Sequence, residues 1–555
     1  MNTFDYLVIG LFSLIVLAVG LLFAREKDMK SFFAGGGSVP WAMSGLSLFM
    51  GFFSAGTFVV WGAIAYEYGA VAIGIQWTMC VAGFLVGKFI AGKWHQTGAL
   101  TAAEYLRYRF GDSTQKLFTY IFLFMSLAYT GAFLYPVAKI ISVSMDVSVY
   151  RCIVVLGLFM ILYTTLGGLK AVMVTDVLQF IILTCAILVV LPLSFEEIGG
   201  VQALFGKAPE GFFAITNEKY NPLFLFSFGI YNAIFLGGNW AYIQRYTSVG
   251  NRKAAKKVVY LFGCLYTFSP VLWMLPPMLY KLIDPNLSGL DMEGAYLLIC
   301  QKVLPAGMLG LMIGGMLYAT ASSVNGALNI SAAVITNDIV LRILPQLKGK
   351  QLIQVARLAT ILCGCCAIGV ALLVPLAGGI VNVILSISAV TGVSLYGPPI
   401  WSLFSKRLSG KGFISITSVS LLINISLKFA PAFMNWGGLN RAEEMLFGVL
   451  IPLVLLTTSE IYYSLVKSIA ETRVPEIAIR RAEVEEAGQT NAFSLRVMSY
   501  SLTAVGVLLA SIALLASAGT MYLLVLSVLI FGLSYFVWTK SKIEAKQKTK
   551  ALETA

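Results

Sequence analysis

The stretch Gly51-Phe-Phe-Ser-Ala-Gly56 interrupts a long apolar run, residues 41–66, near its middle. A second run, residues 222–248, contains Gly229-Ile-Tyr-Asn232 followed by Gly237-Gly238-Asn239. Glycine weakens a helix, and unwound backbone is tolerated at membrane depth only where it lines a cavity or is buried in protein. Glycine is also common in membrane helices because it allows close packing. The two stretches therefore predict either a site built on two broken helices or two tight helix crossings.

The composition places both runs in a lipid bilayer. The chain has 555 residues, of which 58% are hydrophobic and 12% are charged. A soluble fold of this composition could not cover its surface with polar groups. A spanning helix needs about 20 apolar residues. The runs near that length are 4–24, 41–66, 69–93, 117–143, 150–167, 175–195, 222–248, 258–284, 298–340, 353–374, 377–404, 411–431, 442–466, 495–516 and 520–539. The expected fold is all-α, a polytopic membrane protein with about 15 transmembrane helices.

The two interrupted runs are the second and the seventh in chain order, five helices apart. This spacing is typical of a LeuT-type core, in which two five-helix halves repeat with inverted topology. The expected organisation has a ten-helix core with helices added before and after it. Its parts are an N-terminal extra helix and cytoplasmic loop (1–40), the transport core (41–404), peripheral helices (405–466), a charged cytoplasmic linker (467–496), and two C-terminal transmembrane helices with a basic tail (497–555).

The net charge of +13 reflects topology and not a nucleic-acid partner, because the basic residues lie in short loops between apolar runs. With the N-terminus outside, the cytoplasmic segments hold 30 of the 39 Lys and Arg residues. Cytoplasmic loops of membrane proteins carry such an excess. We therefore expect a cell (inner) membrane protein with its N-terminus outside and its C-terminus in the cytoplasm. The expected partners are the bilayer, a small polar solute and Na⁺, with no nucleic acid and no obligate protein partner.

The chain shows no arrangement of residues typical of an enzyme. Its eight cysteines lack metal-ligand spacing with the single histidine, so neither a zinc site nor a catalytic centre is expected. The cluster Cys363-Gly-Cys-Cys366 is read as small packing residues. No cofactor is expected.

Hydroxyl groups recur on one face of the run 298–340. Ala319, Ser322 and Ser323 stand at positions i, i+3 and i+4. Two hydroxyls together with carbonyls freed by a broken helix would form a neutral oxygen cage, which suits a hard cation such as sodium. Alternatively, both serines bond to carbonyls of their own helix, as is common in membrane spans. Asp176 is a rare intramembrane charge and so indicates either function or a carboxylate at a helix start.

Three segments resemble one family of transporters. Gly167-Gly-Leu-Lys-Ala-Val-Met-Val-Thr-Asp176-Val-Leu-Gln179 resembles the signature of the sodium/solute symporter family, which includes bacterial galactose, sialic acid, proline and pantothenate symporters. The segment from Ala319-Thr-Ala-Ser-Ser323 through Thr336-Asn-Asp338 resembles the sodium-site helix of that family. Asn232 to Arg245 resembles its seventh helix, and the similarity runs from residue 1 to about residue 432.

The resemblance implies sodium-coupled uptake of a small polar solute by alternating access. The implied sodium ligands are the carbonyls of Met50, Phe53 and Ala319 and the hydroxyls of Ser322 and Ser323. Asp176 would take part in coupling, and Phe235 would serve as an inner lid on the solute. Some members hold a second ion with hydroxyls that are replaced here by Asn325 and Gly326, so one sodium ion is favoured over two.

The resemblance also implies a solute pocket. Besides Phe235, its positions are Thr57, Gln76, Asn232, Tyr266 and Ser388. These groups are amides, hydroxyls and aromatic rings, which favours a neutral sugar or sugar-like solute. A proton-coupled transporter, an amino-acid or carboxylate transporter on the same fold, and a membrane-embedded solute sensor remain open alternatives.

Overall fold

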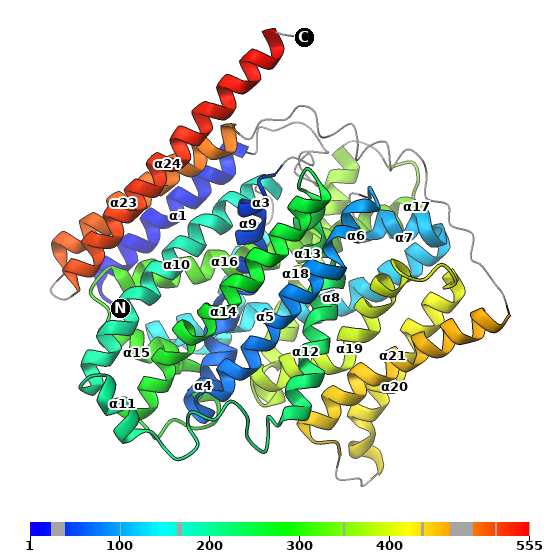
Figure 1. The fold of residues 1–555 in the computed structure, drawn as a ribbon, viewed down its shortest axis with the longest axis horizontal. Coiled ribbons are helices and arrows are strands. Elements are labelled where there is room, and N and C mark those ends of the chain that lie inside the picture. Colours follow the sequence, from blue (N-terminus) through cyan, green and yellow to red (C-terminus); the bar gives the residue numbers. More distant parts are fainter. Residues whose placement is uncertain are drawn as a thin grey trace.

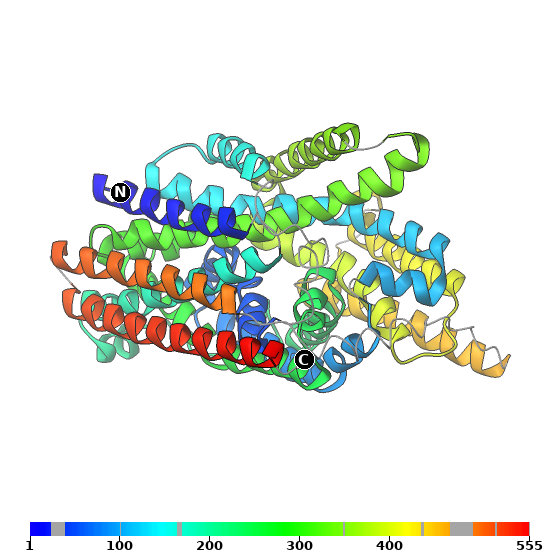
Figure 2. The same cartoon turned by 90° about the horizontal axis from the view of Figure 1, so that it is seen from above.

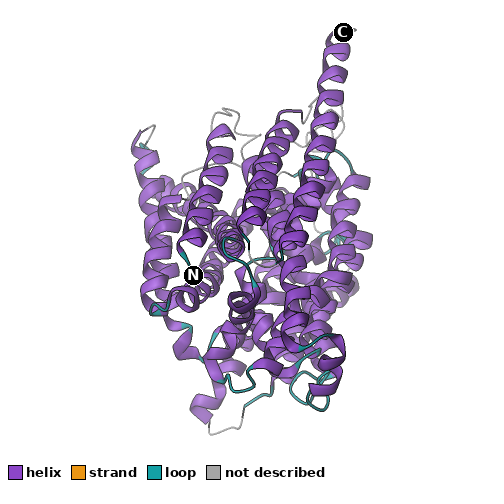
Figure 3. Ribbon diagram, turned by 90° about the vertical axis from the view of Figure 1, so that its left-hand side faces the viewer, coloured by secondary structure: helices purple, strands orange, loops and turns teal. Residues whose placement is uncertain are grey.

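The computed structural model describes residues 1–23, 39–99, 102–163, 169–347, 350–434, 438–466, 492–516 and 519–553. These residues form helices joined by turns and loops, with no strand among them (Figure 3). Most of the expected cytoplasmic loop within 1–40, residues 467–491 of the expected linker, and Gly167 and Gly168 of the signature lie outside the described residues. The side chain of Asn325 lies outside them as well.

The helices follow the apolar runs. In the first part of the chain they are α1 (Thr3–Phe23), α3 (Trp41–Met50), the π-helical turn η2 (Thr57–Trp61), α4 (Gly62–Tyr68), α5 (Val71–Phe89), α6 (Ala91–Gln96), α7 (Ala102–Phe110), α8 (Asp112–Met145), α9 (Val149–Tyr163), α10 (Leu169–Ile198) and α11 (Val201–Lys207). They continue with α12 (Pro222–Gly238), α13 (Trp240–Thr247), α14 (Arg252–Ile283), η3 (Gly289–Gly294), α15 (Ala295–Val303), α16 (Met308–Val334), η4 (Ile335–Val340) and α17 (Leu341–Ile343). The last are α18 (Lys350–Leu373), η5 (Pro375–Ala377), α19 (Ile380–Ser402), α20 (Gly410–Met434), α21 (Arg441–Leu465), α23 (Ala492–Leu515) and α24 (Thr520–Glu553).

The number of long apolar helices is smaller than expected. Among the described residues, ten helices are long and apolar enough to cross a bilayer, and there are up to eleven if α12 and α13 count as one bent span. Four shorter apolar helices accompany them: Thr3–Val19, Trp41–Met50, Val149–Ile161 and Met308–Val324. The count of about 15 spans is therefore not confirmed. One reason is physical, since a broken span is divided into pieces that are each too short to cross alone.

Helices of the two expected five-helix halves pack against each other in a reciprocal way. The first helix of one half, α3, packs against α14, the second helix of the other, and α12 packs in the same way against α5. The third helices, α8 and α16, contact each other, as do the fourth helices, α9 and α18. This reciprocal pattern is compatible with the expected repeat of two five-helix halves.

The remaining helices lie outside these ten. α1, α23 and α24 lie together along one side of the bundle, and α20 and α21 lie at the opposite side (Figures 1 and 2). α1 packs against α16 and α10, while α21 packs against α19. The C-terminal end of α24 projects beyond the bundle (Figure 1).

Only one of the two glycine clusters in the seventh run interrupts the helix. α12 continues through Gly229, so the interruption expected in this run does not lie there; a Cβ on Gly229 would lie 3.7 Å from Thr78 Cβ, an ordinary packing distance. The bend, of 58°, lies at Asn239. The Asn239 side chain accepts a hydrogen bond of 3.0 Å from the Ala241 backbone N–H and so caps α13.

Gly448 allows α21 to approach α19 at the backbone. A Cβ at this position would lie 2.1 Å from the Ala389 carbonyl oxygen, and a backbone atom cannot rotate away. Gly448→Ala should therefore destabilise the protein by about 1–3 kcal/mol, the usual effect of overpacking, seen as a lower melting temperature in detergent.

Gly369 provides the matched control, because a Cβ there would meet no atom within 4 Å. Gly369→Ala should leave the melting temperature unchanged or raise it slightly, since alanine favours helix. Equal melting temperatures for the Gly448→Ala variant and the unsubstituted protein would show that α19 and α21 do not pack as described.

Candidate functional site

The helical path of the second span is broken directly after Met50. α3 ends at that residue, residues 51–54 leave the helix, and the path resumes through the π-helical turn Thr57–Trp61. Thr57 supports the break, since its hydroxyl donates to the Phe52 carbonyl and accepts a 3.3 Å bond from the Ser54 N–H. Thr57 was predicted to bind solute, but in this conformation its hydroxyl forms hydrogen bonds with backbone groups of the break.

The break lies against α16. The Ala55 N–H donates a 3.3 Å hydrogen bond to Thr320 Oγ1, which fixes the restarting helix next to Ala319. Met50, Phe53 and Ala319 are buried, and Ser322 and Ser323 are half-buried on the same helix. The structure thus brings α16, which carries three of the five predicted sodium positions, against the break that carries the other two.

Asp176 joins α10 to three other helices within the bundle. Its Oδ1 accepts a 3.1 Å hydrogen bond from Ser322, and its Oδ2 accepts a 2.6 Å bond from Ser47 of α3. Arg245 of α13 places Nη2 3.9 Å from Asp176 Oδ2 and donates from Nε to Ser47 Oγ at 3.3 Å. The Asp176 and Arg245 side chains are 4% and 14% exposed.

The sequence alone assigned two of these residues incompletely. Asp176 lies two turns inside α10 and binds side chains of other helices, so it is more than a carboxylate at a helix start. Arg245 was given no role of its own, but its side chain is only 14% exposed and lies beside Asp176. Its position inside an apolar run was the signal that could have identified it, because buried charges are paired.

The predicted solute positions other than Thr57 come from four helices. Gln76 lies on α5, Asn232 on α12, Tyr266 on α14 and Ser388 on α19, and all four are buried. Asn232 Nδ2 donates a 2.8 Å hydrogen bond to Thr78 Oγ1, which ties α12 to α5.

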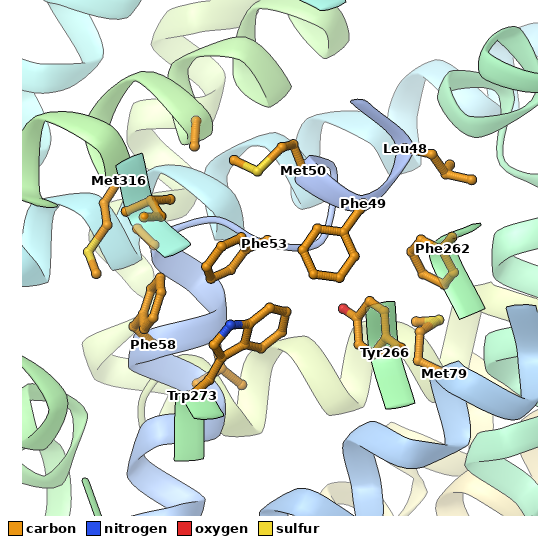
Figure 4. Close-up of a cluster of buried hydrophobic side chains, with 14 of the residues drawn as sticks. Leu48, Phe49, Met50, Phe53, Phe58, Met79, Phe262, Tyr266, Trp273 and Met316 are labelled. Carbon is orange, nitrogen blue, oxygen red and sulfur yellow. The ribbon is translucent and has the colours of Figure 1, made fainter. Parts of the chain in front are cut away.

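Aromatic rings connect these positions to the break. Phe52 contacts Phe235 and Tyr266, with ring centroids 6.0 and 6.4 Å apart, and it lies 4.5 Å from the ring of Tyr242. Phe53 stacks on Trp273 at 4.3 Å and contacts Phe49, whose ring in turn contacts Phe262 and Tyr266 (Figure 4). The side chains of the break therefore pack among the aromatic residues of α12, α13 and α14.

Several further tyrosines surround Phe235. Its ring contacts those of Tyr129, Tyr231, Tyr242 and Tyr396. The Tyr129 hydroxyl shares a 3.0 Å hydrogen bond with Thr391, which lies on the same face of α19 as Ser388. Sequence reasoning missed these tyrosines, Phe52 and Thr78, because tyrosine and phenylalanine recur throughout the apolar runs and give no signal that distinguishes a pocket.

Comparison with known proteins identifies the family. The model of the sodium:solute symporter family matches residues 32–418. The chain is 26% identical over 506 residues to the sodium/glucose cotransporter of Vibrio parahaemolyticus, covering 83% of this chain and 91% of that protein. It is 27% identical over 467 residues to sodium-coupled monocarboxylate transporter 1 of Xenopus laevis, covering 79% and 72% of the two chains.

Solved structures share the fold. A Na⁺-coupled sialic acid symporter in a substrate-bound outward-open state superimposes with a TM-score of 0.69 at 22% identity, covering 85% of this chain and 99% of that one. A nucleobase-cation-symport-1 family transporter in a closed conformation gives a TM-score of 0.52 at 14% identity, covering 82% and 98%.

The LeuT-like helical fold and the family match over most of the chain agree with the resemblance found in the sequence. The chain belongs to the sodium:solute symporter family, and it is a multi-pass membrane transporter that couples solute movement to Na⁺ and is not an enzyme.

Proposed function

We propose that this symporter takes up a small neutral polyhydroxylated solute, a sugar or sugar-like compound, together with one sodium ion. The proposal is carried by the chemistry of the predicted solute positions and of the rings that contact Phe235. Gln76, Asn232 and Ser388 offer amides and a hydroxyl, and the surrounding rings offer flat apolar faces. Such a set can hydrogen-bond hydroxyl groups and pack against the C–H face of a sugar ring. It supplies no fixed charge to hold a carboxylate.

The proposed direction of solute transport is into the cell, across the cell (inner) membrane. This direction assumes the N-terminus outside and the C-terminus in the cytoplasm, as the positions of the basic residues favour. In that orientation the Asp176–Arg245 pair lies on the cytoplasmic side of the break. The core would comprise residues 41–404, with the segments 1–40, 405–466, 467–496 and 497–555 added to it.

Sodium would bind between the break and α16. The proposed ligands are the carbonyls of Met50, Phe53 and Ala319 and the hydroxyls of Ser322 and Ser323. The hydrogen bond from Ser322 to Asp176 is compatible with this role, because a hydroxyl that donates its proton keeps its lone pairs for a cation. Asp176 would also supply a negative charge close to the site without contacting the ion.

The two cargoes would be coupled through residues 50–53. The proposed carbonyl ligands Met50 and Phe53 flank Phe52, whose ring contacts Phe235 and Tyr266. An ion that fixes the backbone on both sides of Phe52 would also fix this wall of the solute pocket. Each cargo would then favour the conformation that the other needs, which is positive coupling.

The Asp176–Arg245 pair would close the inner side. It holds α13 against α3 and α10, the helices that must separate to open a cytoplasmic path. Ser322 would link this pair to the sodium site, because its hydroxyl is one of the two that donate to Asp176. Phe235 would then be the last ring between the solute and the cytoplasm.

One sodium ion is energetically sufficient for useful uptake. Moving one charge through 100 mV releases about 2.3 kcal/mol, whereas a tenfold accumulation of a neutral solute costs about 1.4 kcal/mol. The sodium concentration gradient adds to the free energy that the membrane potential supplies.

The solute class is tested by uptake into proteoliposomes with an imposed sodium gradient. Neutral sugars should compete with one another and carry net positive charge inward, whereas monocarboxylates and amino acids should not compete. The proposal is wrong on the solute if a carboxylate is the better competitor, and wrong on coupling if a proton gradient alone drives uptake.

Ser322→Ala and Ser323→Ala should each raise the half-saturating sodium concentration by on the order of tenfold, about 1.4 kcal/mol, because each removes one of five proposed ligands. Sodium titration of uptake measures this change. Ser331→Ala is the matched control, since Ser331 lies on the same helix but shares its hydrogen bond with Ser126. Unchanged sodium dependence in both site variants would rule out the proposed site.

Asn232→Ala should raise the half-saturating solute concentration at least tenfold, while sodium-dependent changes in tryptophan fluorescence persist. Because the substitution also frees Thr78, Thr78→Val serves as the control that keeps the Asn232 amide. A much smaller effect of Thr78→Val would assign the loss to the amide itself. An unaltered solute affinity in Asn232→Ala would place the solute elsewhere.

A further inference from the structure

Asp5 lies at the start of α1, and its side chain is almost completely enclosed, with 2% of the residue exposed. Its Oδ2 accepts a 2.9 Å hydrogen bond from the Asn2 N–H, and its own N–H donates to Asn2 Oδ1 at 3.1 Å. This reciprocal pair is a capping box, which satisfies backbone donors at the N-terminus of α1.

The same carboxylate also caps a second helix. Asp5 Oδ1 accepts hydrogen bonds from the backbone N–H groups of Gly307, at 2.7 Å, and Gly310, at 3.1 Å. Both donors belong to the first turn of α16, where N–H groups have no partner within the helix. A negative charge is favourable at a helix N-terminus. Here the Asp5 carboxylate accepts hydrogen bonds at the N-termini of both α1 and α16.

Glycines on α16 make this contact possible. A Cβ on Gly310 would lie 2.3 Å from the Asp5 carbonyl oxygen, and one on Gly314 would lie 3.1 Å from Phe12 Cδ1. Further along the two helices, the rings of Phe12 and Tyr318 meet edge to face at 5.9 Å. The contact between α1 and α16 therefore extends from the first turn of α16 to the residue before Ala319.

We infer that Asp5 is a positioning residue for sodium binding: α1, a helix outside the ten-helix core, fixes α16 along its axis. The inference rests on the proposed sodium site, because Ala319, Ser322 and Ser323 lie on α16. A cation site requires all its oxygens at closely defined distances. If α16 slides relative to the break, three of the five proposed ligands move away from the other two.

This role differs from a general contribution to folding. Loss of a purely structural contact lowers the yield or the melting temperature, but each folded molecule then binds sodium with unchanged affinity. Loss of a positioning contact weakens sodium binding in the folded molecules themselves. The half-saturating sodium concentration, measured on purified folded protein, separates the two.

The experiment compares Asp5→Ala and Asp5→Asn with the unsubstituted protein in proteoliposomes. Asp5→Ala should raise the half-saturating sodium concentration at least threefold, while the maximal rate per folded molecule at saturating sodium stays within twofold. Asp5→Asn, which keeps an acceptor oxygen but loses the charge, should give a smaller rise. Should Asp5→Ala fail to fold, Asp5→Asn and Gly314→Ala, which presses lightly on Phe12, carry the same test.

Glu443→Ala is the matched control. Glu443 forms the same kind of capping box with Asn440 at the start of α21, remote in sequence from α1 and α16. It should leave the half-saturating sodium concentration unchanged. An equal shift in Glu443→Ala, or no shift in any folded Asp5 or Gly314 variant, would overturn the inference.

Ser322→Ala, measured alongside, separates this inference from the proposed function. If Ser322→Ala weakens sodium binding but the α1 variants do not, only the role of Asp5 is wrong. If Ser322→Ala has no effect, the sodium site itself is wrong, and the inference falls with it.

Discussion

Backbone that leaves a helix inside a bilayer finds no water, so every freed N–H and C=O group needs a partner in the protein. At the break, several of these groups find partners through contacts that also position α16. The Thr57 hydroxyl donates to the Phe52 carbonyl and accepts from the Ser54 N–H. The Thr320 hydroxyl of α16 accepts from the Ala55 N–H. The last bond ties the break to α16, the helix that carries the two serines.

The break also separates two chemical surroundings. Toward α10 and α16, hydroxyls and one buried ion pair cluster around Asp176. Toward α12 and α14, the ring of Phe52 contacts Phe235. The ring of Phe53 stacks on Trp273 (Figure 4). The same few residues thus lie between a polar environment and an aromatic one. In the proposed scheme, residues 50–53 would link these two environments directly.

The sequence was sufficient for the all-helical membrane class and for the family, because the long apolar runs and the Asp176 signature are specific local signals. It was not sufficient for the number of spans. It was less reliable within the seventh run. Gly229 and the pair Gly237 and Gly238 look alike in sequence, yet the bend belongs to Asn239, which caps α13. Glycine in a membrane helix serves close packing as often as unwinding, and only the neighbouring helices decide which.

Long-range pairs were beyond the reach of the sequence. In the sequence, nothing pairs Arg245 with Asp176, and only the structure shows them side by side. Likewise, nothing in the sequence predicts that Asp5 accepts hydrogen bonds from glycines at the start of α16. The predicted sodium positions were inferred from the family pattern. The structure places the two segments that carry them side by side, and the ion itself remains the proposal on which the coupling scheme depends.

A structure determined by electron microscopy in sodium and again in potassium tests that proposal most directly. The account predicts density in sodium alone, within coordination distance of the carbonyls of Met50, Phe53 and Ala319 and the hydroxyls of Ser322 and Ser323. Sodium-dependent density at another place, or hydroxyls of Ser322 and Ser323 turned away from the break, would contradict it.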